Sequence, residues 1–212
     1  MNTDYIEINT QSSIKLNLDK KIYFDPYKIE NGYHDADIIF ITHDHFDHMD
    51  IISIDQVKNE NTIVVVPKSM KEVIDHTPFK EYFYLEPFDE INIENIHIKA
   101  VPAYNIEKNF HPKQNNWLGY LVTINNVTYY IAGDTDVTPE NKNVECDVAF
   151  IPIGGHFTMD VSEAAELIKI INPKLVIPIH YGSIIGDKSD FSKLKELLSN
   201  TNIEIIEKLY FK

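Results

Sequence analysis

Apolar residues gather in short runs between polar turns, and two of these runs are continuous enough to be buried strands. Residues 38–41 (Ile-Ile-Phe-Ile) and 62–66 (Thr-Ile-Val-Val-Val) are rich in β-branched side chains, which favour strands. Each is expected to be followed by a helical stretch, near residues 50–58 and 68–76. Shorter strands are expected before them, at about residues 5–8, 13–18 and 21–24.

The middle of the chain alternates between apolar and polar positions, which is typical of strands with one buried face. Asn125-Asn126 lies between two such runs and is suited to a two-residue hairpin turn. The pattern predicts strands at about residues 83–85, 91–93, 96–101, 118–124 and 127–132.

The last third repeats the order strand, helix, strand. Asp160 and Glu163 have the spacing of a capping box, and apolar residues at 161, 164, 165, 168 and 171 give the following helix one buried face. Pro173 is expected to end that helix. The remaining elements are expected at residues 148–153, 175–179, 190–199 and 203–207.

Mixed strands with helices in both halves favour an α+β fold in which two packed sheets are flanked by helices. No linker or low-complexity segment interrupts the 212 residues, so a single domain covering residues 1–212 is expected. No apolar run approaches the roughly 20 residues that span a bilayer, and the N-terminus lacks the pattern of a secretory signal.

Charge and cysteine content narrow the choice of partners and compartment. The formal net charge of −14 would repel phosphate backbones, so nucleic-acid binding is disfavoured, and membrane binding is not expected. One cysteine, Cys146, allows no intramolecular disulfide, which fits a reducing cytosol; we interpret it as a plain thiol. A cytoplasmic protein is therefore expected, while its oligomeric state is not readable from the sequence.

Polar residues of one particular kind follow the strand at 38–41. His43, His45, Asp47 and His48 place three imidazoles and a carboxylate within six residues. These groups are the ligands of zinc, iron and manganese. Residues i and i+2 of an extended segment share a side, so one loop could divide its ligands between two adjacent ions. A polar surface turn is the plainer alternative, and the position after a buried strand speaks against it.

Two further strand ends offer ligands of the same class. Asp134 follows Gly133 at the end of the strand near 127–132, and its carboxylate could bridge two cations. His180 ends the strand at 175–179. Taken alone, Asp134 would be interpreted as a turn residue and His180 as a structural histidine. They become ligand candidates because the loop at 43–48 already supplies ligands at another strand end.

Together these residues resemble the signature of the metallo-β-lactamase superfamily, His-x-His-x-Asp-His followed by a distant His, an Asp and a final His. The resemblance extends from about residue 10 to 207. More narrowly, residues 101–105, 133–135, 152–160 and 178–181 are similar to small metal-dependent hydrolases beside the ascorbate-6-phosphate lactonase-like branch. The resemblance implies a four-layer αββα sandwich with its metal site at one edge of the two sheets.

The resemblance also implies a division of the ligands. His43 and His45 would hold one metal, Asp47, His48 and His180 the other, and Asp134 would bridge them. Asp47 would also orient the nucleophile. The family's middle histidine is absent from its usual place, where this chain has Asn105; His111, six residues on, could fold back to replace it. Asn105 and His111 are therefore each open to a role as metal ligand or substrate contact, and His111 could also be a surface loop residue.

Two other residues are candidates for contact with a substrate. His156 follows Gly154-Gly155 and could polarise a substrate oxygen or donate a proton, although a structural loop histidine is an equal alternative. Tyr181 follows His180 and could face the pocket or simply pack. Aromatic residues of the loop at 104–117, namely Tyr104, Phe110 and Trp117, could wall a cleft or belong to the core.

These observations predict a metal-dependent hydrolase that acts on a small ester, lactone or phosphodiester through a metal-activated hydroxide. Zn²⁺ is the expected cofactor, as one or two ions, with Mn²⁺ or Fe as alternatives. Two other functions stay open. One is an iron-dependent oxygen or sulfur oxidoreductase on the same fold. The other is a degenerate module that binds metal or ligand without turnover.

Overall fold

The computed structural model describes residues 2–208. Within it the chain divides into two compact units, residues 2–85 and 86–207, each built on its own sheet. The single domain predicted from the sequence concerns both units together and stays a prediction. None of the helices in residues 2–208 has the length and apolar character needed to cross a membrane.

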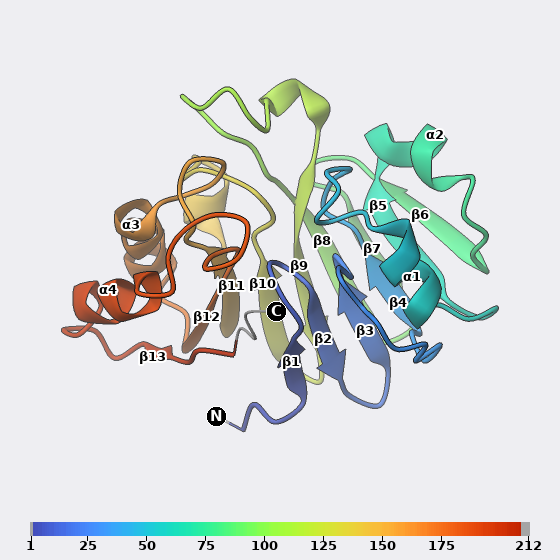
Figure 1. Cartoon of the computed structure of the whole chain (residues 1–212), viewed down its shortest axis with the longest axis horizontal. Helices are drawn as coiled ribbons and strands as arrows, with labels where there is room; N and C mark the ends of the chain where they lie inside the picture. Colours follow the sequence, from blue (N-terminus) through green and yellow to red (C-terminus); the bar gives the residue numbers. More distant parts are fainter. Residues whose placement is uncertain (1, 209–212) are drawn as a thin grey trace. The chain divides into compact units, whose positions relative to one another are not determined.

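The first unit is a six-stranded sheet in the order β1-β2-β3-β4-β5-β6 (Figure 1). Strands β1 to β3 pair antiparallel, whereas β3 to β6 pair in parallel. Its strands are β1 (Ile6–Ile8), β2 (Ile14–Asn17), β3 (Lys21–Phe24), β4 (Ile38–Phe40), β5 (Ile63–Pro67) and β6 (Glu81–Leu85). Its helices are α1 (Ile51–Val57), the 3-10 turn η1 (Lys68–Met70) and α2 (Lys71–Ile74).

Alternation along β4 and β5 explains where the helices of this unit pack. Ile39 and Ile41 point to the same side as Val64 and Val66, because successive side chains of a strand alternate between faces. All four belong to one buried cluster together with Ile54 and Val57 of α1 and with Met70 and Ile74. Both helices therefore cover one face of the sheet through the apolar residues that the sequence pattern displays.

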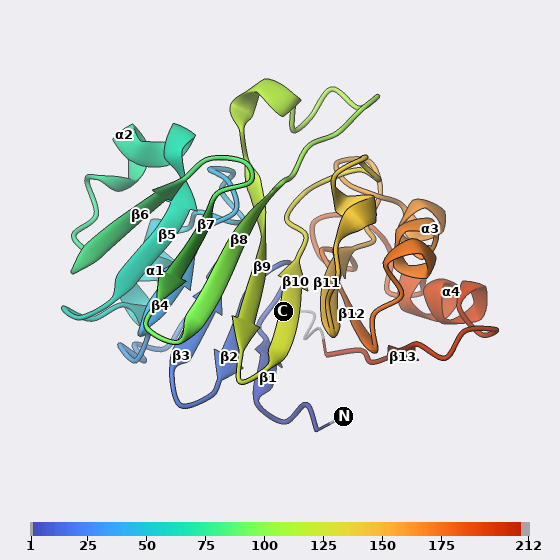
Figure 2. The same ribbon diagram turned by 180° about the vertical axis from the view of Figure 1, so that it is seen from behind.

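The second unit is a seven-stranded sheet in the order β13-β12-β11-β10-β9-β8-β7 (Figure 2). Its strands are β7 (Glu90–Ile93), β8 (Ile96–Pro102), β9 (Leu118–Ile124), β10 (Val127–Ile131), β11 (Val148–Pro152), β12 (Leu175–Ile179) and β13 (Glu204–Ile205). Its helices are α3 (Val161–Ile171) and α4 (Asp190–Leu197), with 3-10 turns η2 (Lys113–Asn115) and η3 (Asn141–Asn143). Strands β10, β11, β12 and β13 are parallel, whereas β7 to β10 are antiparallel.

Two local predictions from the sequence are confirmed. Asp160 caps α3 in a complete capping box, since its side chain accepts from the amides of Ser162 and Glu163, and the Glu163 carboxylate accepts from the Asp160 amide. Asn125 and Asn126 both have positive φ, 51° and 62°, which is the backbone of a type I′ hairpin turn between β9 and β10.

One predicted helix is shorter than expected. The stretch at 68–76 forms η1 and the four-residue helix α2, and the chain then turns at Thr77. Pro78 explains the early end, because a proline disfavours helical backbone in the residue before it. The other predicted elements occur with ends shifted by a few residues, the last strand being two residues long rather than five.

Candidate metal centre

The ligand loop of the first unit begins where β4 ends. β3 and β4 are parallel, with Phe24 opposite Phe40, so the residues that follow them emerge at the same edge of the sheet. Thr42 and His43 come after β4, and Asp25 comes after β3. The loop then turns at His45, whose carbonyl oxygen accepts from the amides of His48 and Met49. This turn brings the His43 ring centroid within 4.6 Å of His45 and 3.9 Å of His48.

Asp25 is the buried residue that organises this loop. Its carboxylate accepts from the Thr42 amide (2.8 Å) and the Thr42 hydroxyl (2.7 Å), and its Oδ2 lies 2.8 Å from Nδ1 of His48. The side chains of Asp25 and His48 are both 0% exposed. Burial raises the pKa of Asp25, while the contacts from His48 and Thr42 oppose that rise. An aspartate in this environment is held in place by its three partners.

These hydrogen bonds assign the tautomers of two histidines. The single Thr42 hydroxyl proton goes to Asp25, so the 3.0 Å contact between the Thr42 oxygen and Nδ1 of His43 needs a proton on the imidazole. His48 likewise donates from Nδ1 to the Asp25 carboxylate. When either ring is neutral, its lone pair then lies on Nε2. A carboxylate that fixes the ring nitrogen opposite the metal is the usual partner of a histidine ligand.

Asp47, the carboxylate of this loop, lies beside His48. Its Oδ2 is 3.7 Å from Nε2 of His48 and accepts a long hydrogen bond, 3.4 Å, from the Gln11 side chain. Gln11 is itself fully buried and has positive φ, 50°, in the turn between β1 and β2. The first unit therefore presents His43, His45, Asp47 and His48 on one loop, with Nε2 of two of them prepared to bind a cation.

In the second unit, two imidazoles converge on one carboxylate. Nε2 of His111 and Nε2 of His180 each lie 3.2 Å from Oδ2 of Asp134, and all three side chains are at most 3% exposed. Asp134 follows β10 and His180 follows β12, two strands of the parallel part of the sheet whose carboxyl ends share an edge. Ligand sites in open α/β sheets lie outside the carboxyl ends of the strands.

A close backbone approach positions His180. A Cβ added to Gly154 would lie 2.2 Å from the carbonyl oxygen of His180 and 2.7 Å from Cγ2 of Ile185. Only a residue without a Cβ fits between these atoms. His180 itself has positive φ, 56°, an uncommon conformation for a residue other than glycine. The glycine after β11 therefore allows the backbone at His180 to come close.

Asn105 and His111 are brought together, but only His111 contacts Asp134. The Asn105 amide donates to the His111 carbonyl (2.8 Å), and its side-chain nitrogen lies 2.7 Å from the Phe157 carbonyl and 3.3 Å from Nδ1 of His111. Its Oδ1 is buried without a hydrogen-bond partner among residues 2–208. Of the two candidates for the missing middle histidine, His111 is therefore the one whose ligand nitrogen faces the Asp134 carboxylate.

The two predicted substrate contacts have different surroundings. His156 is exposed and forms an aromatic group with Phe110 and Phe157, with ring centroids 5.5 Å and 4.5 Å from its own. Tyr181 is fully buried and its hydroxyl donates to Glu207, an arrangement typical of a packed core residue. The substrate role of Tyr181 stays a prediction. Tyr104 and Trp117 are buried, whereas Phe110 is 38% exposed.

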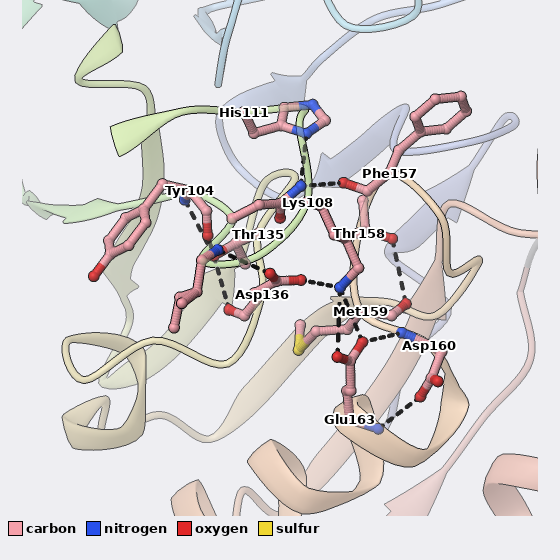
Figure 3. A network of polar contacts seen from close by, with 12 residues as sticks. Tyr104, Lys108, His111, Thr135, Asp136, Phe157, Thr158, Met159, Asp160 and Glu163 are labelled. Carbon is pink, nitrogen blue, oxygen red and sulfur yellow. Dashed lines mark hydrogen bonds and ion pairs between the residues drawn. The ribbon is translucent and has the colours of Figure 1, made fainter. Parts of the chain in front are cut away.

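The loop that carries Asn105 and His111 also carries Lys108, which takes part in an ion-pair network (Figure 3). The Lys108 ammonium donates to Asp136 and lies 3.1 Å from Oε2 of Glu163, the capping-box residue of α3. Burial lowers the pKa of Lys108, but its bonds to Asp136 and Glu163 outweigh that effect and raise it overall. The other Asp136 oxygen accepts from the Ile106 amide at 2.9 Å.

Sequence reasoning missed two of these residues. Asp25 lies 17 residues before Thr42, in a sequence that resembles an ordinary strand end, and only the parallel pairing of β3 with β4 brings it to the ligand loop. Asp136 lies two residues after Asp134 in a sequence typical of a turn, and the structure makes it the partner of Lys108. The available signal was a carboxylate at or shortly after a strand end, and such carboxylates are too common to be specific.

The donor set of each unit suits a borderline divalent cation. Neutral imidazole nitrogens and carboxylate oxygens are the ligands of zinc, iron and manganese, and both units present them near strand ends, all of them buried except the half-buried His45. Buried imidazoles that converge on a carboxylate are costly unless hydrogen bonds or a cation compensate them. The residues present therefore fit a metal ion, and their nature alone does not distinguish zinc from manganese or iron.

The sequence of the chain is similar to a known protein family and to known proteins. A family model described as a beta-lactamase superfamily domain matches residues 5–180. A metal-dependent hydrolase of Pyrococcus horikoshii is 32% identical over 199 residues, which cover 82% of this chain and 84% of that protein. One from Pyrococcus furiosus is 30% identical over 194 residues, with the same two shares.

Solved structures give the same result. A candidate metal-dependent hydrolase of Parabacteroides distasonis is 31% identical, with a TM-score of 0.84 over 97% of this chain and 93% of that one. A metallo hydrolase of Ignicoccus hospitalis has a TM-score of 0.76 at 19% identity, over 98% and 95% of the two chains, and this shows the fold alone. The predicted fold class, the α+β sandwich of the metallo-β-lactamases, is confirmed by these likenesses.

Proposed function

Because the chain belongs to the β-lactamase superfamily, we propose that it hydrolyses a small ester, lactone or phosphodiester with a bound metal ion. The observation that carries the proposal is the buried set of imidazoles and carboxylates at the strand ends, in particular His48 held by Asp25 and Asp134 held between His111 and His180. The resemblance of the sequence motif implies that both sets would belong to a hydrolytic centre.

Family membership confirms the coarser predictions. The predicted superfamily and the predicted class of enzyme, a metal-dependent hydrolase, agree with the matched model and with the names of relatives at 30–32% identity. Metal binding is part of that class. The substrate, the metal and the ligand assignment are proposals, and so is a cytoplasmic location.

For the ligands, we take the predicted set together with His111. His111 fills the role of the middle histidine, because its Nε2 faces Asp134 while Asn105 bonds to the His111 backbone and ring. Asn105 then supports a ligand. The proposed metal ligands are His43, His45, Asp47, His48, His111, Asp134 and His180.

The bound metal would supply Lewis-acid chemistry, lowering the pKa of water and polarising the scissile bond, and Zn²⁺, Mn²⁺ or Fe would suit these donors. Asp47 would accept a hydrogen bond from the attacking water and so orient it. The Gln11 side chain would hold the Asp47 carboxylate through its hydrogen bond to Oδ2. Asp25 keeps His48 in the tautomer that has its lone pair on Nε2. These tasks need no movement of the loop, because the hydrogen bonds already exist.

His156 with Phe110 and Phe157 supports the substrate side of the proposal. The two phenylalanine rings meet edge to face, with centroids 4.6 Å apart, and Phe110 keeps an exposed surface. This group would contact an apolar part of the substrate, while His156 bonds a polar oxygen. A small molecule is favoured, since the net charge of −14 opposes nucleic acid.

Replacing Phe110 by alanine is expected to raise KM for substrates with an aryl or alkyl group by roughly threefold to tenfold, the worth of one aromatic contact. The value of kcat should change little, because the Phe110 ring packs on His156 and Phe157, which are not proposed ligands. Steady-state kinetics on a pair of esters, one with and one without the apolar group, measures this. Phe88→Ala, an exposed phenylalanine of the same unit, is the control, and an equal KM change in both variants would contradict the proposal.

The hydrolase proposal is tested by measuring metal content and turnover together. Metal-stripped protein is reloaded with Zn²⁺, Mn²⁺ or Fe²⁺ and tested with lactones, phosphodiesters and esters. Hydrolysis is expected with at least one metal, at least one ion should bind per chain, and His48→Ala and Asp134→Asn should lower turnover by more than a hundredfold.

Other outcomes would point to the alternative functions. A coloured, EPR-active iron protein that consumes oxygen and shows no hydrolysis would favour oxidoreductase chemistry. Stoichiometric metal without turnover on the whole substrate set would favour a binding module. Unchanged hydrolysis in both variants would reject the assigned ligands while leaving the family assignment intact.

A further inference from the structure

The loop from Asn105 to His111 has a neck and a tip that are held separately. At the neck, the Asn105 amide donates to the His111 carbonyl at 2.8 Å, which closes the loop. Ile106 and Phe110, the residues next to the neck, are 58% and 38% exposed, so apolar burial does little to anchor the loop. His111 has positive φ, 53°, which costs free energy and persists only where its surroundings hold the backbone.

Lys108 is the central residue of this loop, at its tip, and reaches two other segments. Its ammonium donates to Asp136, two residues after Asp134, and to Glu163 at the start of α3 (Figure 3). Its side chain is 22% exposed and that of Asp136 only 9%, so water weakens this pair less than a surface ion pair. The Lys108 ammonium therefore connects the loop to the segment that follows β10 and to the N-terminal cap of α3.

The carboxylates that receive Lys108 also serve the backbone around them. Oδ2 of Asp136 accepts from the Ile106 amide, and the Asp136 amide donates to the Tyr104 carbonyl at 3.0 Å. Oε2 of Glu163 accepts from the Asp160 amide at 2.8 Å as part of the capping box. Glu163 is thus held by the cap of α3, and Asp136 by Tyr104 as well as by the loop itself, so Lys108 adds a further link between the loop and two held carboxylates.

We propose that Lys108 is a positioning residue of the metal centre: it pins the loop 105–111 so that Nε2 of His111 faces the Asp134 carboxylate. This inference rests on the proposed function, because it gives His111 a role as ligand. Lys108 acts through the loop, because its ammonium binds Asp136 and Glu163. Its removal is expected to loosen the loop and weaken metal binding without unfolding the sheet.

Lys108→Met tests this, since methionine keeps most of the apolar stem and removes the charge. In the metal-free protein, hydrogen exchange of the Asn105 and Ile106 amides should accelerate at least tenfold, with β9 amides unchanged. Calorimetry with Zn²⁺ alone should show affinity lower by about tenfold to a hundredfold, as for other residues that hold a ligand. Lys108→Arg should show amide exchange rates and a Zn²⁺ affinity close to those of the wild type.

Two variants separate the ion pair from general loop stability. Lys113→Met removes another lysine of the segment between β8 and β9, which pairs with Glu140 at 2.8 Å, and should change neither value. Glu163→Gln keeps an acceptor for the Asp160 amide and should give a smaller effect in the same direction.

Any of three results overturns the proposal. The Asn105 and Ile106 amides of Lys108→Met exchange as slowly as those of the wild type, Lys113→Met shows the same changes as Lys108→Met, or the loop loosens in Lys108→Met while its Zn²⁺ affinity stays unchanged. Faster exchange throughout β9 would make Lys108 a residue of general stability and would also overturn it. Exchange in the metal-free protein needs no substrate. A protein without hydrolytic activity could therefore still show the loop effect, and the two failures are distinguishable.

Discussion

Replacing Asp25 by asparagine is expected to lower metal affinity by about tenfold to a hundredfold, although Asp25 is not a proposed ligand. Asparagine keeps an oxygen for the Thr42 amide but places an NH₂ donor where Oδ2 now lies, 2.8 Å from Nδ1 of His48. A donor at that position selects the neutral tautomer with its proton on Nε2. His48 would then lack the lone pair that a metal needs.

Two measurements together test this expectation. Titration with Zn²⁺ or Mn²⁺ reports the affinity, and ¹⁵N spectra of the histidine rings report the tautomer of His48 in the metal-free protein. Asp35→Asn is the matched control, because Asp35 is a carboxylate of the same unit that bonds to Lys15 and Tyr23 instead. An Asp25→Asn protein that binds metal as tightly as the Asp35→Asn protein would refute the tautomer argument.

Gly154→Ala is expected to destabilise the fold by about 1–3 kcal/mol or more and to reduce metal binding, because the added methyl group overpacks a close contact. The new Cβ would meet the His180 carbonyl oxygen at 2.2 Å, well inside any tolerated contact. Backbone atoms cannot rotate away as a flexible side chain can. Relief would therefore move His180, and with it the imidazole that faces Asp134.

Gly155→Ala separates this clash from the ordinary cost of replacing a glycine. Gly155 has positive φ, 68°, but an added Cβ would find its nearest neighbour 3.5 Å away, in Asp160. Its substitution should cost only the backbone strain of about 1–2 kcal/mol. Chemical unfolding gives both stabilities and calorimetry gives the affinities. Equal loss of metal binding in the two alanine variants would argue against the assigned role of Gly154.

Local patterns in the sequence predicted those structural features that depend on residues close together in the chain. The apolar runs at β4, β5 and β12, the capping box of Asp160 and Glu163, and the Asn125-Asn126 turn are all contained in windows of a few residues. The loop from His43 to His48 is equally local, which explains why its ligands could be named at once. Asp134 and His180 were recognised because each directly follows a predictable strand.

The remaining contacts of the candidate site depend on which strands pair. Asp25 reaches Thr42 only through the parallel register of Phe24 with Phe40. Lys108 meets Asp136 across 28 residues, and Glu163 across 55, so no window contains both partners. His111 was one of two candidates for the same role, and the hydrogen bonds of Asn105 were needed to distinguish them.

The strand order has a consequence for how the protein reaches its native state. Along β1 to β6, and again along β7 to β13, every strand pairs only with the strands before and after it in the chain. Closing short loops costs less entropy than closing long ones, and chains rich in local contacts fold faster. We therefore expect each sheet to assemble in the order of synthesis, with Asp25, Thr42 and His48 joined while residues beyond 85 are still being made.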